Sequence, residues 1–181
     1  SVTEGLRSMM YTVAWYTDMA QHGPEETREY YQDLVDLHIP ICKSFGTDQG
    51  FEVACTGIQV LGGVGFTRDF PLEQNARDQK IGSIYEGTNG IQALDLVGRK
   101  LSLHTGRLLR HFFHPATEFV ETHQESEELK DVVLPLAKAL NKLQQATLMI
   151  AQKGLSDPEE AAAVATDYLK MFGLVAVGYM W

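Results

Sequence analysis

Residues 58–92 read IQVLGGVGFTRDFPLEQNARDQKIGSIYEGTNGIQ, and they interrupt a chain that is otherwise patterned for helices. Closely spaced glycines open the stretch, Pro71 lies inside it, and Gly82 and Gly87 come near its end. Because glycine and proline weaken helices and favour turns, we predict an irregular connection over residues 62–88. A long segment without regular structure is uncommon in a compact domain and often carries function. The connection is therefore a candidate functional segment.

On both sides of this stretch, apolar residues recur at the spacing of amphipathic helices. The spacing predicts helices over about residues 3–21, from Glu25 onward and over about 47–61, with a kink or interruption at Pro40. Helical spacing resumes near Asn89. No segment alternates with the two-residue period of a β-strand. We therefore predict an all-α fold, an up-and-down helical bundle with a helical extension.

The character of the chain changes beyond about residue 110. The polar, acidic stretch from His111 to Glu128 is typical of a solvated face or connection, and further helices follow it. The last helix is expected to begin at Asp157-Pro158, a capping acid followed by a proline in the first turn. We assign residues 1–110 to one helical bundle and residues 111–181 to an additional C-terminal helical region. That region ends in an apolar run without a polar stop, so we expect it to be cut within a helix.

Composition excludes several classes of function. The formal net charge is −9, and the 15 Lys and Arg are scattered, whereas nucleic-acid binding needs a basic patch. No apolar run is long enough to span a membrane, and no signal peptide is visible. Cys42 and Cys55 lack metal-ligand spacing, which favours buried free thiols in a reducing, cytoplasmic setting.

Each part of residues 58–92 has an ordinary structural interpretation when it is taken alone. The pair Gly62-Gly63 is most simply the end of a helix, although it would also let the backbone approach a ligand. Glu86 is most simply a surface acid ahead of a helix capped by Thr88 or Asn89, although it is also a possible general base. Elsewhere, His111 and His114 lack further ligands in suitable positions, so we expect no metal site.

Taken together, the span from Gln59 to Gln92 resembles the C-terminal signature of acyl-CoA dehydrogenases. It matches the block Q-x-x-G-G-x-G-[FY]-[ST]-R-[DE]-[FY]-P and then R-D-x-K-I-x-x-I-Y-E-G-T-N-x-I-Q, with the family's spacing between them. The resemblance extends more weakly over about residues 1–105, and the tail after residue 110 looks like the additional helical region of longer bacterial members. It implies an FAD-dependent enzyme that introduces a trans-2,3 double bond into an acyl-CoA. Electrons would pass to an electron-transfer flavoprotein.

The resemblance implies a role for each matching residue. Glu86 matches the glutamate that removes the substrate α-proton while the β-hydrogen leaves as hydride to the flavin. Since the α-proton of a thioester is only weakly acidic, such a base must be desolvated. The backbone N–H at Glu86 would also polarise the thioester carbonyl. Gly87 matches a position lining the thioester, where a side chain would obstruct the substrate.

The resemblance also implies cofactor contacts and an oligomer. One group matches the turn that contacts the adenosine-diphosphate end of FAD, usually that of a neighbouring subunit: Gln59, Val60, Leu61, Gly62 and Gly63. A homo-oligomer, dimer or tetramer, is therefore implied. Thr88 and Asn89 match positions at the flavin, whereas Gly90 departs from the Glu or Gln common there. Three further charged residues are expected to be salt-bridged loop anchors: Arg68, Arg77 and Asp78.

Two alternative functions stay open. The family builds its pocket from an N-terminal helical domain and a middle β-domain, neither of which is visible in these 181 residues. The chain by itself is therefore expected to be inactive. The first alternative is a helical oligomerisation or docking module without activity of its own. An acyl-CoA oxidase would use the same base. The residues do not distinguish fatty acyl from methylthio-propionyl substrates.

Overall fold

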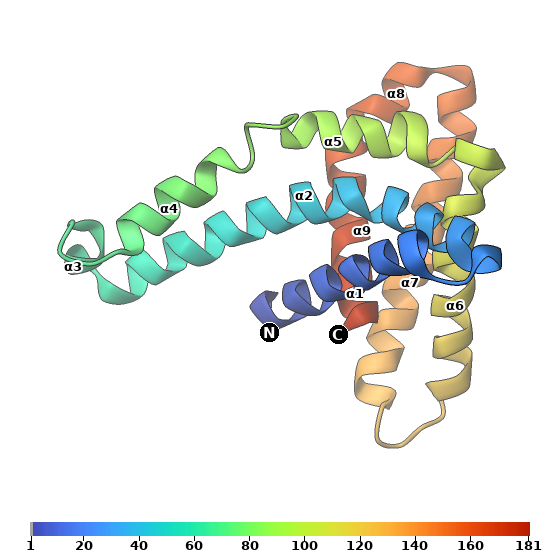
Figure 1. The fold of residues 1–181 in the computed structure, drawn as a ribbon, viewed down its shortest axis with the longest axis horizontal. Helices are drawn as coiled ribbons and strands as arrows, with labels where there is room; N and C mark the ends of the chain where they lie inside the picture. Colours follow the sequence, from blue (N-terminus) through green and yellow to red (C-terminus); the bar gives the residue numbers. More distant parts are fainter. Residues whose placement is uncertain (1) are drawn as a thin grey trace.

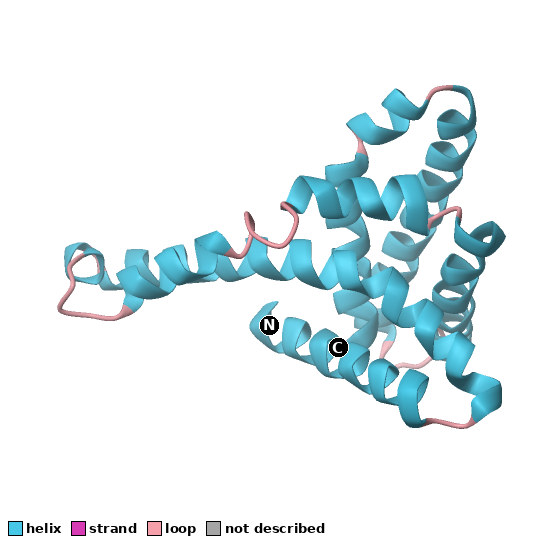
Figure 2. Ribbon diagram, turned by 45° about the horizontal axis from the view of Figure 1, so that its top comes forward, coloured by secondary structure: helices cyan, strands magenta, loops and turns pink. Residues whose placement is uncertain are grey.

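The computed structural model describes residues 2–181 as helices joined by short turns (Figures 1 and 2). No strand occurs in this range, so the predicted all-α class is confirmed. In chain order the elements are α1 (Val2–His22), α2 (Glu25–Leu61), α3 (Gly63–Phe66), α4 (Leu72–Ile81), α5 (Asn89–Asp95), the π-helix η1 (Leu96–Lys100), η2 (Leu103–Gly106), α6 (Arg107–His123), α7 (Lys130–Ser156), α8 (Pro158–Ala163) and α9 (Ala165–Met180).

The molecule consists of a helical body and an arm that projects from it (Figure 1). The arm is the C-terminal part of α2, the short helix α3 at its tip, and α4 running back along α2. Helix α2 is one element of 37 residues, so Pro40, at which a kink or an interruption was expected, does not end the helix. Pro40 is fully buried, although proline removes one backbone hydrogen bond from a helix interior.

The predicted irregular connection over residues 62–88 is wrong in most of its length, because it contains α3 and α4. Gly62, with φ of 62°, ends α2 and starts the reversal. A Cβ on Gly65 would lie 2.6 Å from the Ile58 carbonyl oxygen, so glycine lets the tip fold back tightly. Residues 72–81 then form a helix that packs along α2. The glycines mark the two turns of the arm and do not describe the segment between them.

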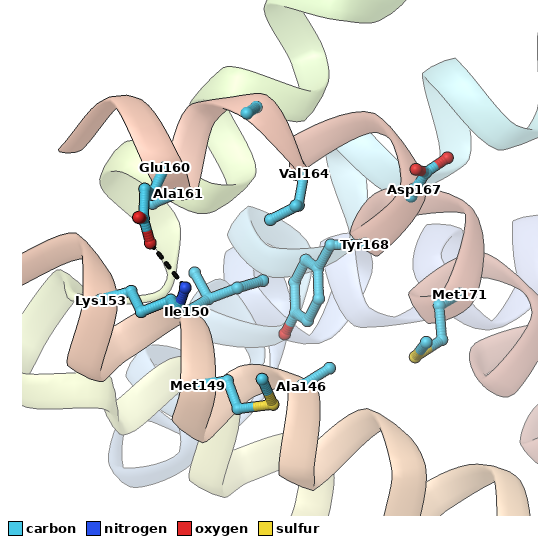
Figure 3. A pocket seen from close by; sticks show the side chains of 11 residues that line it. Ala146, Met149, Ile150, Lys153, Glu160, Ala161, Val164, Asp167, Tyr168 and Met171 are labelled. Carbon is cyan, nitrogen blue, oxygen red and sulfur yellow. Dashed lines mark hydrogen bonds and ion pairs between the residues drawn. The ribbon is translucent and has the colours of Figure 1, made fainter. Parts of the chain in front are cut away.

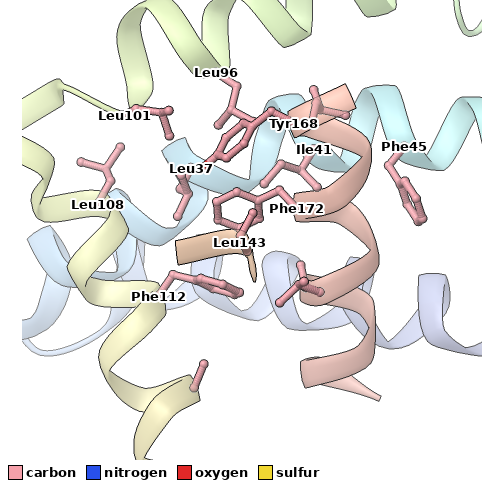
Figure 4. Packing of buried hydrophobic residues seen from close by; sticks show 14 of the residues in the cluster. Leu37, Ile41, Phe45, Leu96, Leu101, Leu108, Phe112, Leu143, Tyr168 and Phe172 are labelled. Atoms are coloured by element: carbon pink, nitrogen blue, oxygen red, sulfur yellow. The ribbon is translucent and has the colours of Figure 1, made fainter. Parts of the chain in front are cut away.

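One hydrophobic core joins the two halves of the sequence (Figure 4). Phe112 of α6 and Phe172 of α9 are fully buried, with ring centroids 4.9 Å apart, and Leu37 of α2 is fully buried in the same cluster. Helix α9 crosses α2 closely, since a Cβ on Gly173 would lie 2.5 Å from Cγ of Phe45. The apolar run at the end of the chain is therefore a central core helix packed against α1, α2, α5 and α7.

Of the two expectations for the polar stretch after residue 110, a solvated face or a connection, the connection is limited to residues 124–129, and helix α6 precedes it. The buried residues of α6 recur every four positions, so it is amphipathic and packs on the body: Leu108, Phe112, Ala116 and Val120. The exposed polar residues His114, Glu118 and Glu121 lie on its outer face, whereas His111 points inward toward Asp33. A helix begins at Pro158 as predicted, with Asp157 Oδ1 accepting a hydrogen bond of 2.9 Å from the Glu159 N–H. This helix is α8 and ends at Ala163, so the last helix is the separate α9 from Ala165.

The two halves meet at an irregular junction. The π-helix η1 is followed by η2, in which His104 and Thr105 have φ of 49° and 58°. Lys100 is buried there, with Nζ 3.3 Å from Asp36 Oδ1. Of the two cysteines, Cys42 is buried, whereas Cys55 is exposed on the arm, contrary to expectation. Between residues 2 and 181, no helix is both long and apolar enough to cross a membrane.

Candidate active site

The turn of residues 82–88, between α4 and α5, carries Glu86. Glu86 and Gly87 have φ of 54° and 82°, so two consecutive residues adopt the left-handed conformation. Few residues other than glycine do so, and such positions are concentrated at functional sites. At Gly87 an added Cβ would be strained and would also lie 3.0 Å from Nε2 of Gln92. The shape of the turn therefore favours glycine at position 87, and it holds Glu86 in a conformation that few residues other than glycine adopt.

Helix α5 begins directly behind Glu86. The Thr88 hydroxyl accepts a hydrogen bond of 3.4 Å from the Ile91 N–H, so Thr88 is the N-cap, one of the two capping residues considered from sequence. The Gln92 side chain donates to the Glu86 carbonyl oxygen at 3.4 Å, and the Asn89 N–H donates to the Ser83 carbonyl oxygen at 3.1 Å. These bonds fix the backbone on both sides of Glu86.

The side chain of Asn89 fastens the turn to α2. Its Nδ2 donates to Asp48 Oδ1 at 2.8 Å, to Thr47 Oγ1 at 3.0 Å and to the Ser44 carbonyl oxygen at 3.2 Å. Its Oδ1 accepts from Lys43 Nζ at 3.0 Å. We call these five residues the α2 clasp. Its four partners on α2 carry no signal that sequence reasoning detected, because they come together only when the arm folds back.

Lys43 also donates to the Gly87 carbonyl oxygen at 2.6 Å. The clasp therefore holds the peptide between Gly87 and Thr88. The Glu86 carboxylate makes no hydrogen bond or ion pair with any residue from 2 to 181. Glu86 and Gly87 are both exposed, on the outside of the arm. The hydrogen-bonded turn therefore carries an exposed carboxylate, as is required of a base whose ligand binds from outside this chain.

The group Gln59–Gly63 lies at the tip of the arm, where α2 ends, and all five residues are exposed. Helix α4 separates the tip from the Glu86 turn (Figure 1). Ten helical residues span roughly 15 Å. One chain therefore does not bring the two predicted groups together. A Cβ at Gly62 or Gly63 would meet no atom within 4 Å, so the backbone there is open to close approach.

Two of the three residues expected to anchor the loops, Arg77 and Asp78, pair with other residues of α4 instead. Arg77 Nε lies 3.3 Å from Glu73 Oε2, and Asp78 Oδ1 accepts a hydrogen bond of 2.6 Å from Gln74. Both pairs span one helical turn and support the helix rather than the loops. Arg68 follows α3 and makes no ion pair within residues 2–181.

The arm exposes many large apolar side chains, a feature that sequence reasoning missed. Helix α4 buries none of its residues, and the buried residues of α2 all lie between Asp33 and Phe45. Val60 and Phe66 are 79% and 78% exposed. Others on the arm and the Glu86 turn are also exposed: Val53, Leu61, Val64, Phe70, Ile81, Ile84 and Tyr85. Apolar surface gathered in this way is typical of an interaction face.

A separate hollow lies between α7, α8 and α9, away from the arm (Figure 3). Its walls are mainly apolar, and Tyr168 lies across its middle. Lys153 Nζ and Glu160 Oε2 pair across one end at 2.7 Å. No residue predicted from sequence lines it.

Comparison with known proteins decides the family. Residues 2–101 match the model described as "Acyl-CoA dehydrogenase, C-terminal domain", and residues 112–181 match "Acetyl-CoA dehydrogenase C-terminal like". The chain belongs to the acyl-CoA dehydrogenase family. Its similarity to dehydrogenases covers the whole chain and not the signature alone, which confirms the predicted resemblance.

Three similar proteins illustrate the relationship. The chain is 34% identical to a 3-methylmercaptopropionyl-CoA dehydrogenase of Ruegeria pomeroyi, over 99% of this chain and 31% of the relative. It is 33% identical to a broad-specificity linear acyl-CoA dehydrogenase of Mycobacterium tuberculosis, over 98% of this chain and 30% of the relative. The crystal structure of Caenorhabditis elegans ACDH-11 in complex with C11-CoA shares the fold, with a TM-score of 0.76, 21% identity, and coverage of 97% and 30%. The chain thus spans about a third of the length of these acyl-CoA dehydrogenases.

Proposed function

We propose that this chain supplies Glu86 as the base of an FAD-dependent acyl-CoA dehydrogenase that introduces a trans-2,3 double bond into an acyl-CoA. The observation that carries the proposal is the left-handed Glu86-Gly87 turn, held by the α2 clasp with its carboxylate unpaired. Glu86 takes the α-proton of the thioester. Gly87 offers no side chain to obstruct the thioester, and the fixed Glu86 N–H polarises its carbonyl.

The open backbone at Gly62 and Gly63 and the unpaired carboxylate fit a flavin site shared between chains. Bound FAD would accept the β-hydrogen as hydride. We propose that Gln59, Val60, Leu61, Gly62 and Gly63 contact the adenosine-diphosphate end of the FAD of a neighbouring subunit, because they lie far from Glu86 of the same chain. Thr88 and Asn89, which begin α5 behind Glu86, would lie near the flavin, with the Asn89 side chain engaged in the clasp.

The exposed apolar surface of the arm supports a homo-oligomer, dimer or tetramer, in which that surface is covered. We propose an acyl-CoA as substrate, an electron-transfer flavoprotein as acceptor, and a cytoplasmic location. In this arrangement residues 1–110 form the bundle that carries the site, and residues 111–181 are an additional region fused to its core. The same exposed arm favours the second candidate, an assembly module without activity of its own.

The decisive test is Glu86→Gln in the full-length enzyme that contains this chain, assayed with acyl-CoA and an artificial electron acceptor. We expect turnover to fall about 10²- to 10⁴-fold, the usual contribution of a general base. Flavin absorbance of the purified protein should be unchanged. Glu52→Gln, on the exposed face of the arm, is the matched control and should keep full turnover. Undiminished turnover of the Glu86 variant would remove this residue from the mechanism.

Measuring hydrogen peroxide alongside acceptor reduction separates an oxidase from a dehydrogenase. A dehydrogenase should reduce the acceptor with little peroxide. An inactive full-length protein that still assembles would instead support the assembly module.

A further inference from the structure

A cluster of aromatic side chains surrounds a small cavity on the body, on the part of the molecule that the proposed function does not use. The cavity has a volume of about 200 Å³ and lies where α1, α2, α6 and α9 meet. Six side chains, which we call the aromatic box, form its walls: Trp15, Tyr16, Tyr30, Tyr31, His111 and Tyr179. None of them belongs to the Glu86 turn or the arm.

The rings of the box form a continuous wall. The Tyr31 ring meets the rings of Trp15 and Tyr30 edge to face, each at 5.2 Å between centroids. Tyr30 in turn lies 4.6 Å from His111, and Tyr16 lies 5.6 Å from Trp15. Three of the four helices contribute two or more aromatic residues to the cavity lining or its floor. Several aromatic rings around one cavity are an arrangement that binds organic cations in other proteins.

The tyrosine hydroxyls of the box are free to meet a ligand. Within residues 2–181, those of Tyr16, Tyr30, Tyr31 and Tyr179 make no hydrogen bond with the chain, and none of these oxygens is fully buried, so a ligand can reach them. The Tyr16 hydroxyl also lies close enough to the other three to be affected by them. Burial first, and then the nearby hydroxyls of Tyr179, Tyr30 and Tyr31, together raise the pKa of Tyr16 to about 12.

The charges around the box favour a cation. His111 does not bring a competing positive charge near neutral pH, because burial lowers its pKa. Asp33 raises the pKa of His111, whereas Arg107 and Arg110 lower it. The guanidinium of Arg107 is occupied by Asp33 at 2.5 Å and Glu29 at 2.8 Å, and Arg110 donates to the Thr105 carbonyl oxygen at 2.7 Å.

Asp33 and one further carboxylate, Glu118, act on residues of the box itself. Asp33 Oδ2 lies 3.1 Å from Nδ1 of His111, which makes no hydrogen bond, and Glu118 lies close enough to raise the pKa of Tyr179. With a formal net charge of −9, the chain as a whole also attracts cations.

We propose that the aromatic box binds a small organic cation of the quaternary ammonium class. The cavity is smaller than the roughly 300 Å³ at which pockets for drug-sized ligands begin, so it suits a compact head group and not a large molecule. Ring faces contact the methyl groups, the hydroxyls meet a polar tail, and the half-exposed Trp15 lies at the entrance.

The test is a titration of the chain with choline chloride, followed by the fluorescence of Trp15. The chain has two tryptophans, so Trp181→Phe leaves Trp15 as the sole reporter. Matched titrations use sodium chloride, for ionic strength, and 3,3-dimethylbutan-1-ol, the neutral analogue with the same shape. We expect a saturable change with choline and about tenfold weaker binding of the neutral alcohol. No saturable change, or equal binding of the alcohol, would overturn the proposal.

Variants locate the site. Tyr31→Leu removes the central ring and should weaken choline binding by about tenfold, whereas Tyr31→Phe keeps the ring and should bind nearly as well. Tyr11→Leu, on the exposed side of α1, is the control and should have no effect. Equal binding by the Leu and Phe variants of Tyr31 would place the cation elsewhere. If circular dichroism shows that Tyr31→Leu is unfolded, the comparison of choline with its neutral analogue decides the question.

Discussion

Replacing Gly173 with alanine tests the close crossing of α9 and α2, on which the body of the fold depends. A Cβ at this position would lie 2.5, 2.6 and 2.9 Å from three atoms of the Phe45 side chain. Phe45 is 5% exposed, and two of the three atoms are its Cβ and Cγ, which cannot swing aside as the end of a flexible side chain can. Crowding of this kind in a core costs about 1–3 kcal/mol. The gain in helix propensity from glycine to alanine, about 1 kcal/mol, opposes it.

We expect the net result to be a loss of about 2 kcal/mol in the free energy of unfolding, because contacts this short lie at the costly end of the range. For a chain of this size, that corresponds to a fall of roughly 4–8 °C in Tm. Urea unfolding of the chain, followed by circular dichroism, measures the change. The midpoint should move with little change in slope.

The same helix provides the matched control. At Gly178 an added Cβ would meet only Leu136 Cδ1, at an ordinary 3.9 Å. Gly178→Ala should therefore stabilise the chain by about 0.5–1 kcal/mol. Phe45→Leu combined with Gly173→Ala should lose less stability than the sum of the two single variants. If Gly173→Ala is as stable as the parent chain, the close packing of α9 on α2 is not the constraint described above.

Two further predictions concern the site and the core. Asn89→Ala removes the centre of the α2 clasp, so hydrogen exchange of residues 86–92 should accelerate by the equivalent of about 1–2 kcal/mol while α7 and α9 are unaffected. The control is Asn75→Ala, on the exposed face of α4. Unchanged exchange in the Asn89 variant would show that the clasp does not hold the turn. Burial lowers the pKa of His38 to about 4, below the value of about 6.5 in an unfolded chain, so the unfolded chain binds the proton first. Its contribution is complete above pH 6.5 and is lost as pH falls toward 4, by about 3 kcal/mol in all. Between pH 6.5 and 4, His38→Leu should remove most of this loss in the free energy of unfolding, whereas the exposed His22→Gln should not. If the His38 variant loses as much stability over this range as the parent chain, the effect belongs to other groups.

The arm shows where sequence reasoning reaches its limit. Glycine and proline correctly marked the ends of its turns, at Gly62 and Gly87, but they wrongly suggested that residues 72–81 lack structure. This helix buries none of its residues, so it lacks the apolar stripe by which a surface helix is recognised. It forms because its residues favour helix and because α2 lies beside it.

Helix α6 illustrates the opposite error. Its polar residues dominated the prediction, although four residues at helical spacing pack into the core. The pairing of Asp33 with Arg107 joins residues 74 positions apart, which no local pattern reveals.

The signature of residues 59–92 was determined by sequence alone, as were the all-α class and the family, because helical periodicity and the order of motif residues are local properties. The tertiary structure decided how these residues are presented. It placed Gln59–Gly63 and Glu86 at separate ends of one arm, and it built the α2 clasp from side chains more than forty residues apart. It also brought four helices together around the aromatic box. These arrangements depend on long-range packing, in which each contact is set by the whole chain and not by its neighbours in sequence.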